Sequence, residues 1–191
     1  SKMPGFGYST PAKNCKVGSK LREVKGSVCE SCYAMKGRYT FSNVSQALEK
    51  RLAGIGHPRW VEAMVFQINK VRSKPGGEFF RWHDSGDLQS IEHLDKICEI
   101  ARQTPETTHW LPTREVKMVA DYEGKIPKNL TIRISAPMVG TRLNVNKAVT
   151  SSVGAEDKPG FECGAYTRGG ECGPCRACWD LKVKNVNYPL H

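Results

Sequence analysis

The sequence lacks several patterns by which common classes of protein are recognised. No apolar run approaches the roughly 20 residues that a membrane-spanning helix needs, and no charged-then-apolar leader opens the chain. We therefore expect a cytoplasmic protein that makes no membrane contact. There is no G-x-x-x-x-G-K-[ST] phosphate loop, no H-E-x-x-H zinc motif and no G-x-S-x-G nucleophile elbow. Hydrolases that depend on these motifs are excluded.

Internal repeats, low-complexity segments and Lys/Arg-rich tracts are also missing, although the chain as a whole is basic. Its formal net charge is +10, which favours an anionic partner such as nucleic acid, a phosphate compound or an acidic protein. The alternative is a solvated basic surface with no dedicated partner. The oligomeric state is not indicated by any feature of the sequence.

Length and composition are those of a single globular domain. The chain has 191 residues, of which 39% are hydrophobic and 25% are charged. Residues 1–40 lack hydrophobic periodicity and are rich in Gly, Ser and Lys, and the part from residue 140 onward is similar. We expect one α/β domain over residues 1–191, with metal-binding segments at residues 1–40 and 140–191.

The middle of the chain is regular. Apolar spacing predicts helices over 42–54, 58–73 and 91–103, and a weaker one over 115–123. Ser42 is the expected N-cap and Gly54 the expected stop of the first helix, Pro58 the first helical residue of the second, and Pro105 the stop of the third. Strands are predicted over 78–82, 109–112 and 130–135.

Strands and helices that alternate in this order indicate a parallel sheet with right-handed crossovers. Three strands are too few for a closed eight-stranded barrel. The expected fold is therefore α/β, a partial parallel (β/α) barrel or open sheet with Cys-rich loops at both termini. In such folds the functional groups collect at the carboxyl ends of the strands.

The eight cysteines are the strongest chemical signal in the sequence. Cys98 falls on the apolar face of the helix over 91–103, so we interpret it as a core residue. The others form two groups with C-x2-C spacing, which in a reducing compartment favours metal over disulfides. The predicted metal ligands are Cys15, Cys29, Cys32, Cys163, Cys172, Cys175 and Cys178.

The spacing C-x2-C-x2-C at residues 172–178 is closer to a ferredoxin run than to the separated hooks of structural zinc. We therefore expect one or two [4Fe–4S] clusters, with zinc as the alternative for one site. Four thiolates complete a cluster, whereas three leave one iron open to substrate or cofactor. The alternatives are a fourth ligand from elsewhere in the chain, or one site shared by both groups.

Two arginines are candidates for a further role. Arg81 and Arg133 lie on the same, inward face of the sheet if their strands run parallel. Buried guanidinium groups need anions, so these residues either receive a substrate anion or form internal ion pairs. The expected internal partners are Asp84, Asp87 and Glu115.

Several motifs carry a resemblance to known families. GSVCESCYAMKGRY, FFRWHDSGDL, HWLPTRE and IRISAPM resemble the phage gene-product-88 family, over a region from about Pro4 to Trp179. CESCYAMKGRY is also similar to the cysteine segment of radical S-adenosylmethionine (SAM) enzymes, in which three cysteines hold a [4Fe–4S] cluster. The spacing here is C-x13-C-x2-C in place of the usual C-x3-C-x2-C.

The resemblance implies roles for residues at the strand ends. Cys15, Cys29 and Cys32 would hold the open cluster. Ser85, Gly86 and Asp87 would stand where radical-SAM enzymes contact the methionyl amine, with Asp87 or Asp84 meeting the ammonium group. The residues expected to line the same mouth are Arg114, Glu115 and Ser135.

The expected function is that of an iron–sulfur protein with an open [4Fe–4S] cluster for redox or radical chemistry, with SAM as a candidate cofactor, on an anionic substrate. If the protein is phage-encoded, it would act in the host cytoplasm. The alternative is a non-catalytic, metal-stabilised module that binds nucleic acid or a host protein through its basic surface. Simple electron carriage is a third interpretation.

Overall fold

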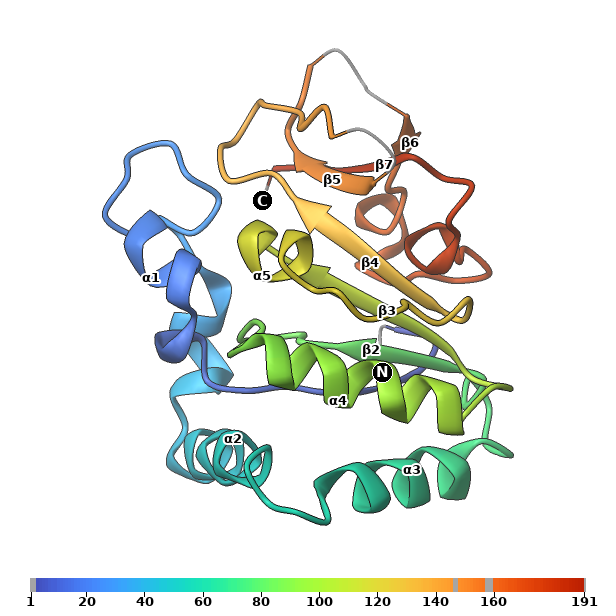
Figure 1. The fold of residues 1–191 in the computed structure, drawn as a ribbon. Coiled ribbons are helices and arrows are strands. Elements are labelled where there is room, and N and C mark those ends of the chain that lie inside the picture. Colours follow the sequence, from blue (N-terminus) through green and yellow to red (C-terminus); the bar gives the residue numbers. More distant parts are fainter. Residues whose placement is uncertain (1–2, 146–147, 157–159, 191) are drawn as a thin grey trace.

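The computed structural model describes residues 3–145, 148–156 and 160–190. At its centre is a seven-stranded sheet in the order β1-β2-β3-β4-β5-β7-β6, and all of its strand pairs are parallel. The strands are β1 (Phe6–Tyr8), β2 (Phe79–Trp82), β3 (Thr108–Thr113), β4 (Leu130–Ser135), β5 (Val149–Val153), β6 (Phe161–Glu162) and β7 (Asn185–Tyr188). The edge strands β1 and β6 are not paired with each other, so the sheet is open and not a closed barrel (Figure 1).

Helices cover one face of the sheet. The helices are α1 (Lys16–Leu21), α2 (Ser42–Gly54), α3 (Trp60–Val71), α4 (Ile91–Gln103) and α5 (Val116–Ala120). In Figure 1, α4 runs along this face and α3 lies beyond it. The core between them and the sheet includes Trp82, Leu94, Ile97, Cys98 and Leu111, each with no exposed surface. Cys98 is therefore a core residue, as its helical position predicts.

The predicted middle of the chain is confirmed with small shifts at the helix bounds: α3 is shorter at both ends than the predicted 58–73, and α5 covers Val116–Ala120 of the predicted 115–123. The α4 helix begins and ends where its apolar spacing predicts, and the Ser90 side chain caps it by accepting a hydrogen bond from the His93 N–H at 3.1 Å. The N-cap prediction for Ser42 is wrong, because Phe41 occupies that position and Ser42 is the first helical residue. Pro58 also precedes its helix, which begins at Trp60.

The opposite face of the sheet is covered by the C-terminal segment. Trp179 is buried there, and its ring packs edge-on against Phe79 at 5.4 Å and Trp110 at 5.1 Å between centroids. The Trp179 indole N–H donates to the carbonyl of Phe80 at 3.1 Å, and its own carbonyl accepts from the Thr131 hydroxyl at 2.7 Å. The segment that carries four cysteines is thus fixed to β2 and β4.

The sheet contains four strands that hydrophobic patterning does not predict, namely β1, β5, β6 and β7. The expectation of three strands is therefore wrong. In β5 and β7 most of the buried residues are polar, although Val149 and Val186 are buried as well. The Thr150 hydroxyl donates to Asn185 Oδ1 and the Ser152 hydroxyl to Asn187 Oδ1, both at 2.8 Å. A ladder of hydrogen-bonded Ser, Thr and Asn side chains takes the place of apolar alternation, so hydrophobic periodicity does not predict these strands.

Within the described part of the chain, no helix is long and apolar enough to cross a membrane.

Candidate metal centres

The three N-terminal cysteines gather around Gly18 of α1. A Cβ placed on Gly18 would lie 3.6 Å from the Sγ atom of Cys29 and 3.7 Å from that of Cys15. Both sulfurs therefore border one residue, and a side chain there would enter the space beside them. Cys32 is held near them by a turn in which its N–H donates to the Cys29 carbonyl at 3.2 Å.

Burial dominates the electrostatics of these thiols. It raises the pKa of Cys15 to about 12, and the negative charges of Asp87, Cys32 and Cys29 contribute in the same direction. Burial also raises the pKa of Cys29, and the Arg114 guanidinium opposes it. The metal-free thiols of Cys15 and Cys29 are therefore protonated near neutral pH. A metal that binds them as thiolates must displace these protons, so its affinity falls as pH falls.

Two contacts place the N-terminal cysteine segment over the carboxyl ends of the strands. Glu115, which follows β3 and is 3% exposed, accepts a hydrogen bond from the Val17 N–H at 2.8 Å. The Val28 N–H donates to the Pro137 carbonyl after β4 at 2.9 Å. Figure 1 shows this segment at the edge toward which the β4 arrow points. Glu115 thus positions α1 through a backbone contact.

Asp87 links the ends of β2 and β3 beneath the cysteines. Its Oδ1 accepts from the Thr113 hydroxyl at 2.6 Å and the Leu88 N–H at 2.8 Å, and its Oδ2 accepts from the Arg114 N–H at 2.9 Å. Burial raises the pKa of Asp87 to about 6, against the lowering effect of these donors. Both carboxylate oxygens already have partners within the chain, and contact with a substrate ammonium stays a prediction.

Asp84 lies beside Asp87 in sequence but makes different contacts. Its Oδ1 accepts from Arg81 Nη1 at 2.9 Å, its Oδ2 from the Tyr39 hydroxyl, and its main-chain carbonyl from the Tyr33 hydroxyl. The predicted internal ion pair of Arg81 is therefore present, with Asp84 as the partner.

The remaining predicted cofactor residues make structural contacts. The Ser85 hydroxyl donates to the Thr10 carbonyl at 2.9 Å, and Gly86 has a φ of 82° and leaves no room for a Cβ, which would lie 1.9 Å from Thr10 Oγ1. Together they clamp the loop after β2 onto the segment after β1. Ser135, at the end of β4, is hydrogen-bonded to Ser151 of β5 at 3.2 Å.

The four C-terminal cysteines also come together. They line one cavity of about 20 Å³ over the sheet face that carries Trp179. A turn brings two of them close, because the Cys175 N–H donates to the Cys172 carbonyl at 3.1 Å. The Cys163 N–H is hydrogen-bonded to the Asn187 carbonyl of β7 at 2.8 Å. The lining cysteines are Cys163, Cys172, Cys175 and Cys178.

Cys178 is the most restrained member of this second group. Its Sγ lies 3.1 Å from the Tyr188 hydroxyl. Burial raises the pKa of Cys178 to about 11, while Tyr188 and Arg133 lower it and the thiols of Cys163 and Cys172 raise it. As at the first group, a bound metal would have to displace thiol protons.

Neither group is arranged around a single ion. Among the described residues, no three His, Cys, Asp or Glu side chains lie in positions to hold one metal ion. Ligands of one zinc ion must all reach the same atom, whereas the thiolates of a cubane each bind a different iron and stand farther apart. A cavity of about 20 Å³ holds little more than one water molecule. Either kind of centre would therefore require the thiols to move.

Comparison with known proteins supports one of the resemblances. A family model described as gene product 88 matches residues 1–181. The chain belongs to the gene product 88 family. Neither the curated proteins nor the solved structures gave a match. A relation to radical-SAM enzymes is not supported by these comparisons.

In this gene product 88 protein, the structure also reveals residues that sequence patterns did not mark. Four such residues contact or border a cysteine segment: Gly18, Trp110, Trp179 and Tyr188. Of these, Gly18 could have been noticed from its place in the sequence between Cys15 and the C-x2-C pair. His83 is the only non-glycine residue with positive φ in the described ranges, and both of its buried ring nitrogens lack partners there.

Proposed function

We propose that this protein is an iron–sulfur protein with two metal centres, one of which has an open coordination position. The first centre would be a [4Fe–4S] cluster held by Cys15, Cys29 and Cys32 at the carboxyl edge of the sheet. The second would be held by the four cysteines of the C-terminal segment. The observation that carries the proposal is that the seven cysteines separate into two spatial groups, while Cys98 lies apart in the core.

The donor set at the first group fits such a cluster. Three sulfurs are available, and two of them, those of Cys15 and Cys29, border the space that a side chain at Gly18 would fill. The group lies where parallel α/β sheets hold their ligands, beyond the carboxyl ends of the strands. Arg114 supplies a positive charge close enough to oppose the raised pKa of Cys29, which favours thiolate over thiol and so favours metal binding.

Redox or radical chemistry follows from the ligand number. Three thiolates leave one iron without a protein ligand, and an open position is what a catalytic metal site offers to its substrate or cofactor. SAM is a candidate for that position. Arg114 would then offer a guanidinium to an anionic group, because its Nε is buried and has no hydrogen-bond partner among the described residues.

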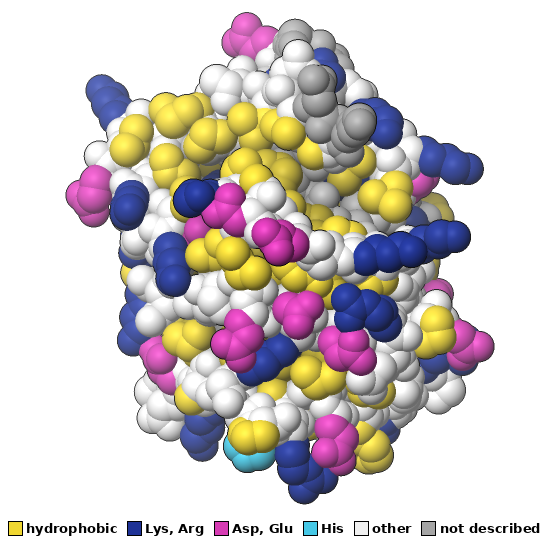
Figure 2. Space-filling model, viewed as in Figure 1, with side chains coloured by type: hydrophobic (Ala, Val, Ile, Leu, Met, Phe, Trp, Pro, Cys, Tyr) yellow, Lys and Arg dark blue, Asp and Glu magenta, His cyan; other side chains and the backbone are white. Residues whose placement is uncertain are grey.

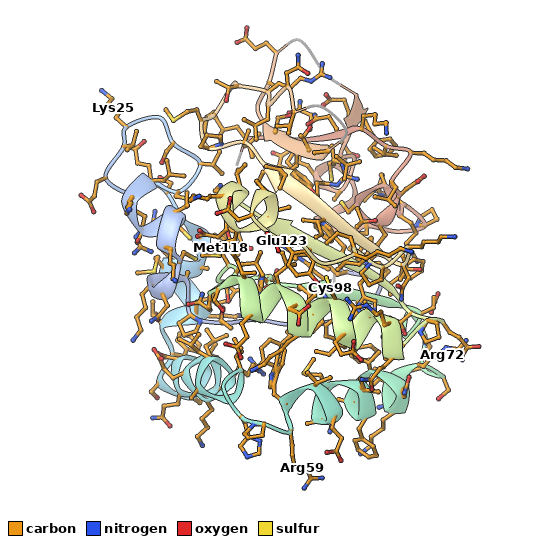
Figure 3. The ribbon with its side chains drawn as sticks, in the orientation of Figure 1. Lys25, Arg59, Arg72, Cys98, Met118 and Glu123 are labelled. Atoms are coloured by element: carbon orange, nitrogen blue, oxygen red, sulfur yellow. The ribbon has the colours of Figure 1, made fainter. Side chains whose placement is uncertain are left out.

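The charge around the first group supports an anionic substrate. Exposed basic side chains surround the cysteines on this segment, and Lys25 points into solvent from the loop after α1 (Figure 3). They are Lys13, Lys16, Lys20, Lys25, Lys36 and Arg38. On the face shown in Figure 2, by contrast, acidic and basic side chains are interspersed. Residues 13–38 contain seven Lys or Arg residues and two Glu residues, a net charge of +5, so about half of the chain's net charge of +10 lies around the first centre.

The test is metal analysis of anaerobically purified protein with visible and EPR spectra. Two cubanes correspond to about eight irons per chain. A variant with Cys15, Cys29 and Cys32 changed to Ser should keep about half of the iron, and so should a variant with the four C-terminal cysteines changed. Cys98→Ser is the matched control and should keep all of it.

The open position is tested separately. Added SAM should alter the EPR signal of the reduced protein and should have no effect on the variant without the three N-terminal cysteines. Zinc alone in the purified protein would refute the redox function. Full iron content with no response to SAM, together with salt-dependent binding of random RNA or DNA, would instead favour the nucleic-acid-binding module.

A further inference from the structure

Arg81 lies between the two cysteine groups. It is in β2, on the sheet face covered by the C-terminal segment, and its side chain is 17% exposed. The guanidinium carbon stands 4.7 Å from the centroid of the Trp110 ring, a cation–π contact. Its Nη1 donates to Asp84 at 2.9 Å. Arg81 therefore contacts Asp84 on the side of the N-terminal cysteines and Trp110 on the side of the C-terminal cysteines.

On one side the contacts lead to the N-terminal cysteines. Asp84, the ion-pair partner of Arg81, accepts the hydroxyl hydrogen of Tyr33 with its main-chain carbonyl. Tyr33 directly follows Cys32 in the chain. Arg81 is therefore connected to Cys32 through Asp84 and Tyr33.

On the other side the contacts lead to the C-terminal cysteines. The Trp110 ring, on which the guanidinium lies, packs edge-on against Trp179 at 5.1 Å between centroids. Trp179 is buried and directly follows Cys178. The electrostatics agree, because the charge of Arg81 lowers the pKa of Cys172, and the thiolate of Cys178 raises the pKa of Arg81.

We propose that Arg81, with Trp110 and Trp179, couples the two cysteine groups into one electron-transfer unit, in which an electron received at the C-terminal centre passes inside the protein to the N-terminal centre. This rests on the function proposed above. The path runs from Trp179 through Trp110, Arg81 and Asp84 to Tyr33, each in contact with the next. An unbroken series of contacts matters because electron tunnelling slows steeply with separation and across gaps. The packed C-terminal centre would be the entry site and the open N-terminal centre the site of use.

The electron balance is simple. A one-electron donor of low potential, such as a reduced iron–sulfur or flavin carrier protein, loses one electron and the C-terminal centre gains it. The C-terminal centre then returns to its oxidised state as the N-terminal centre is reduced. No bond forms or breaks, and Arg81 stays protonated throughout.

The charge of Arg81 should also affect how easily each of the two centres is reduced. Adding an electron to a buried centre adds a negative charge in a medium of low dielectric, and a nearby cation favours the reduced state. Because the charge of Arg81 acts on Cys172 in one group and on Tyr33, the neighbour of Cys32, in the other, its removal should make both centres harder to reduce. A residue that served only one centre would shift only one.

The experiment is an EPR-monitored redox titration with dithionite on the full-length holoprotein. Arg81→Gln removes the charge and Arg81→Lys keeps it. Arg102→Gln is the control, because Arg102 is 41% exposed and forms a surface ion pair with Glu99 and one long hydrogen bond to the Lys125 carbonyl. We expect both midpoint potentials to shift to more negative values in Arg81→Gln, a smaller shift in Arg81→Lys, and none in the control.

The second measurement requires no change at Arg81. In the fully reduced wild-type protein, two neighbouring paramagnetic centres should split or broaden each other's EPR signals. If that spectrum equals the sum of the spectra of the two cysteine variants that keep one centre each, the coupling is overturned and the proposed function survives. A shift of only one potential in Arg81→Gln would likewise overturn it. Absence of iron–sulfur signals in wild-type protein would instead defeat the proposed function itself.

Discussion

Replacing Arg133 by methionine should release the C-terminal cysteine segment from the sheet. Arg133 is in β4, is fully buried and donates to five main-chain carbonyls: Nη1 to Thr150 and Val183, Nη2 to Ala177 and Asp180, and Nε to Cys178. Three of these acceptors are the carbonyls of Cys178 itself and of its neighbours Ala177 and Asp180. Methionine fills similar space and donates nothing, so these carbonyls would lose their partner.

The distances determine the size of the effect. The Nη bonds are 2.8 to 3.1 Å long, and the Nε bond at 3.4 Å is weak. A hydrogen bond to a charged group contributes about 1.5–3 kcal/mol, and a buried acceptor left without a partner costs about 1–3 kcal/mol. The freed carbonyls recover part of the loss if residues 177–183 detach and meet water. We therefore expect the free energy of unfolding to fall by about 4 kcal/mol.

Urea denaturation followed by tryptophan fluorescence measures this change, and hydrogen exchange locates it. Exchange should rise in residues 177–183 before the rest of the sheet opens. The metal content of the C-terminal centre should fall while that of the N-terminal centre is retained. Arg133→Lys, which keeps the charge but has a different donor geometry, should lose less.

The matched control is Arg59→Met. Arg59 points away from the body of the protein (Figure 3), and its ion pair with Glu62 is on the surface, where its side chain is 74% exposed. Its loss should change stability by no more than about 0.5 kcal/mol. A loss below about 1 kcal/mol in Arg133→Met, with unchanged exchange in residues 177–183, would refute the role we assign to this residue.

Three further predictions concern stability. Burial lowers the pKa values of His93 and His109 to about 4, so their stabilising effect is present above the unfolded value of 6.5 and is lost as pH falls toward 4. Linkage gives a loss of about 2 kcal/mol per histidine between pH 7 and pH 5, and burial, which also lowers the pKa of His83, adds to the total. His109→Gln, compared with wild type by urea denaturation at both pH values, should remove about 2 kcal/mol of this loss. Cys98→Ala should cost about 1 kcal/mol in urea denaturation, since it removes one sulfur from a fully buried site, and a cost near zero would contradict its place in the core. Gly76→Ala should lower the melting temperature strongly, because Gly76 has a φ of 77° and a Cβ there would lie 1.4 Å from the Pro4 carbonyl oxygen. An unchanged melting temperature would show that the segment before β1 does not pack against Gly76.

The middle of the fold was predictable because it follows hydrophobic periodicity. The helix at 91–103 and the strand at 130–135 have the bounds that their apolar spacing predicts. Strands β5 and β7 could not be found in this way, because most of their buried positions are Ser, Thr and Asn, whose side chains hydrogen-bond to one another across the pair. Such pairing depends on residues 35 positions apart and leaves no local pattern.

The candidate site divides in the same manner. The cysteine spacing alone separated Cys98 from the others, and the helical position of Cys98 predicted its burial. The structure shows that Ser85, Gly86 and Asp87 join strand ends, which their local sequence does not reveal, and the cofactor roles expected for them stay predictions. Local sequence cannot show whether a polar group is already occupied, because its partners come from other strands.

The sequence by itself determined the alternation of strands and helices, the parallel sheet and the two sets of cysteines, because each is encoded by local spacing. Tertiary structure alone decided that the sheet has seven strands and stays open, and that the C-terminal cysteines cover the face opposite the helices. It also decided that Arg81 and Arg133, on the same face, have different partners, Asp84 for one and main-chain carbonyls for the other. These features depend on contacts between distant segments, which form only when the whole chain is packed.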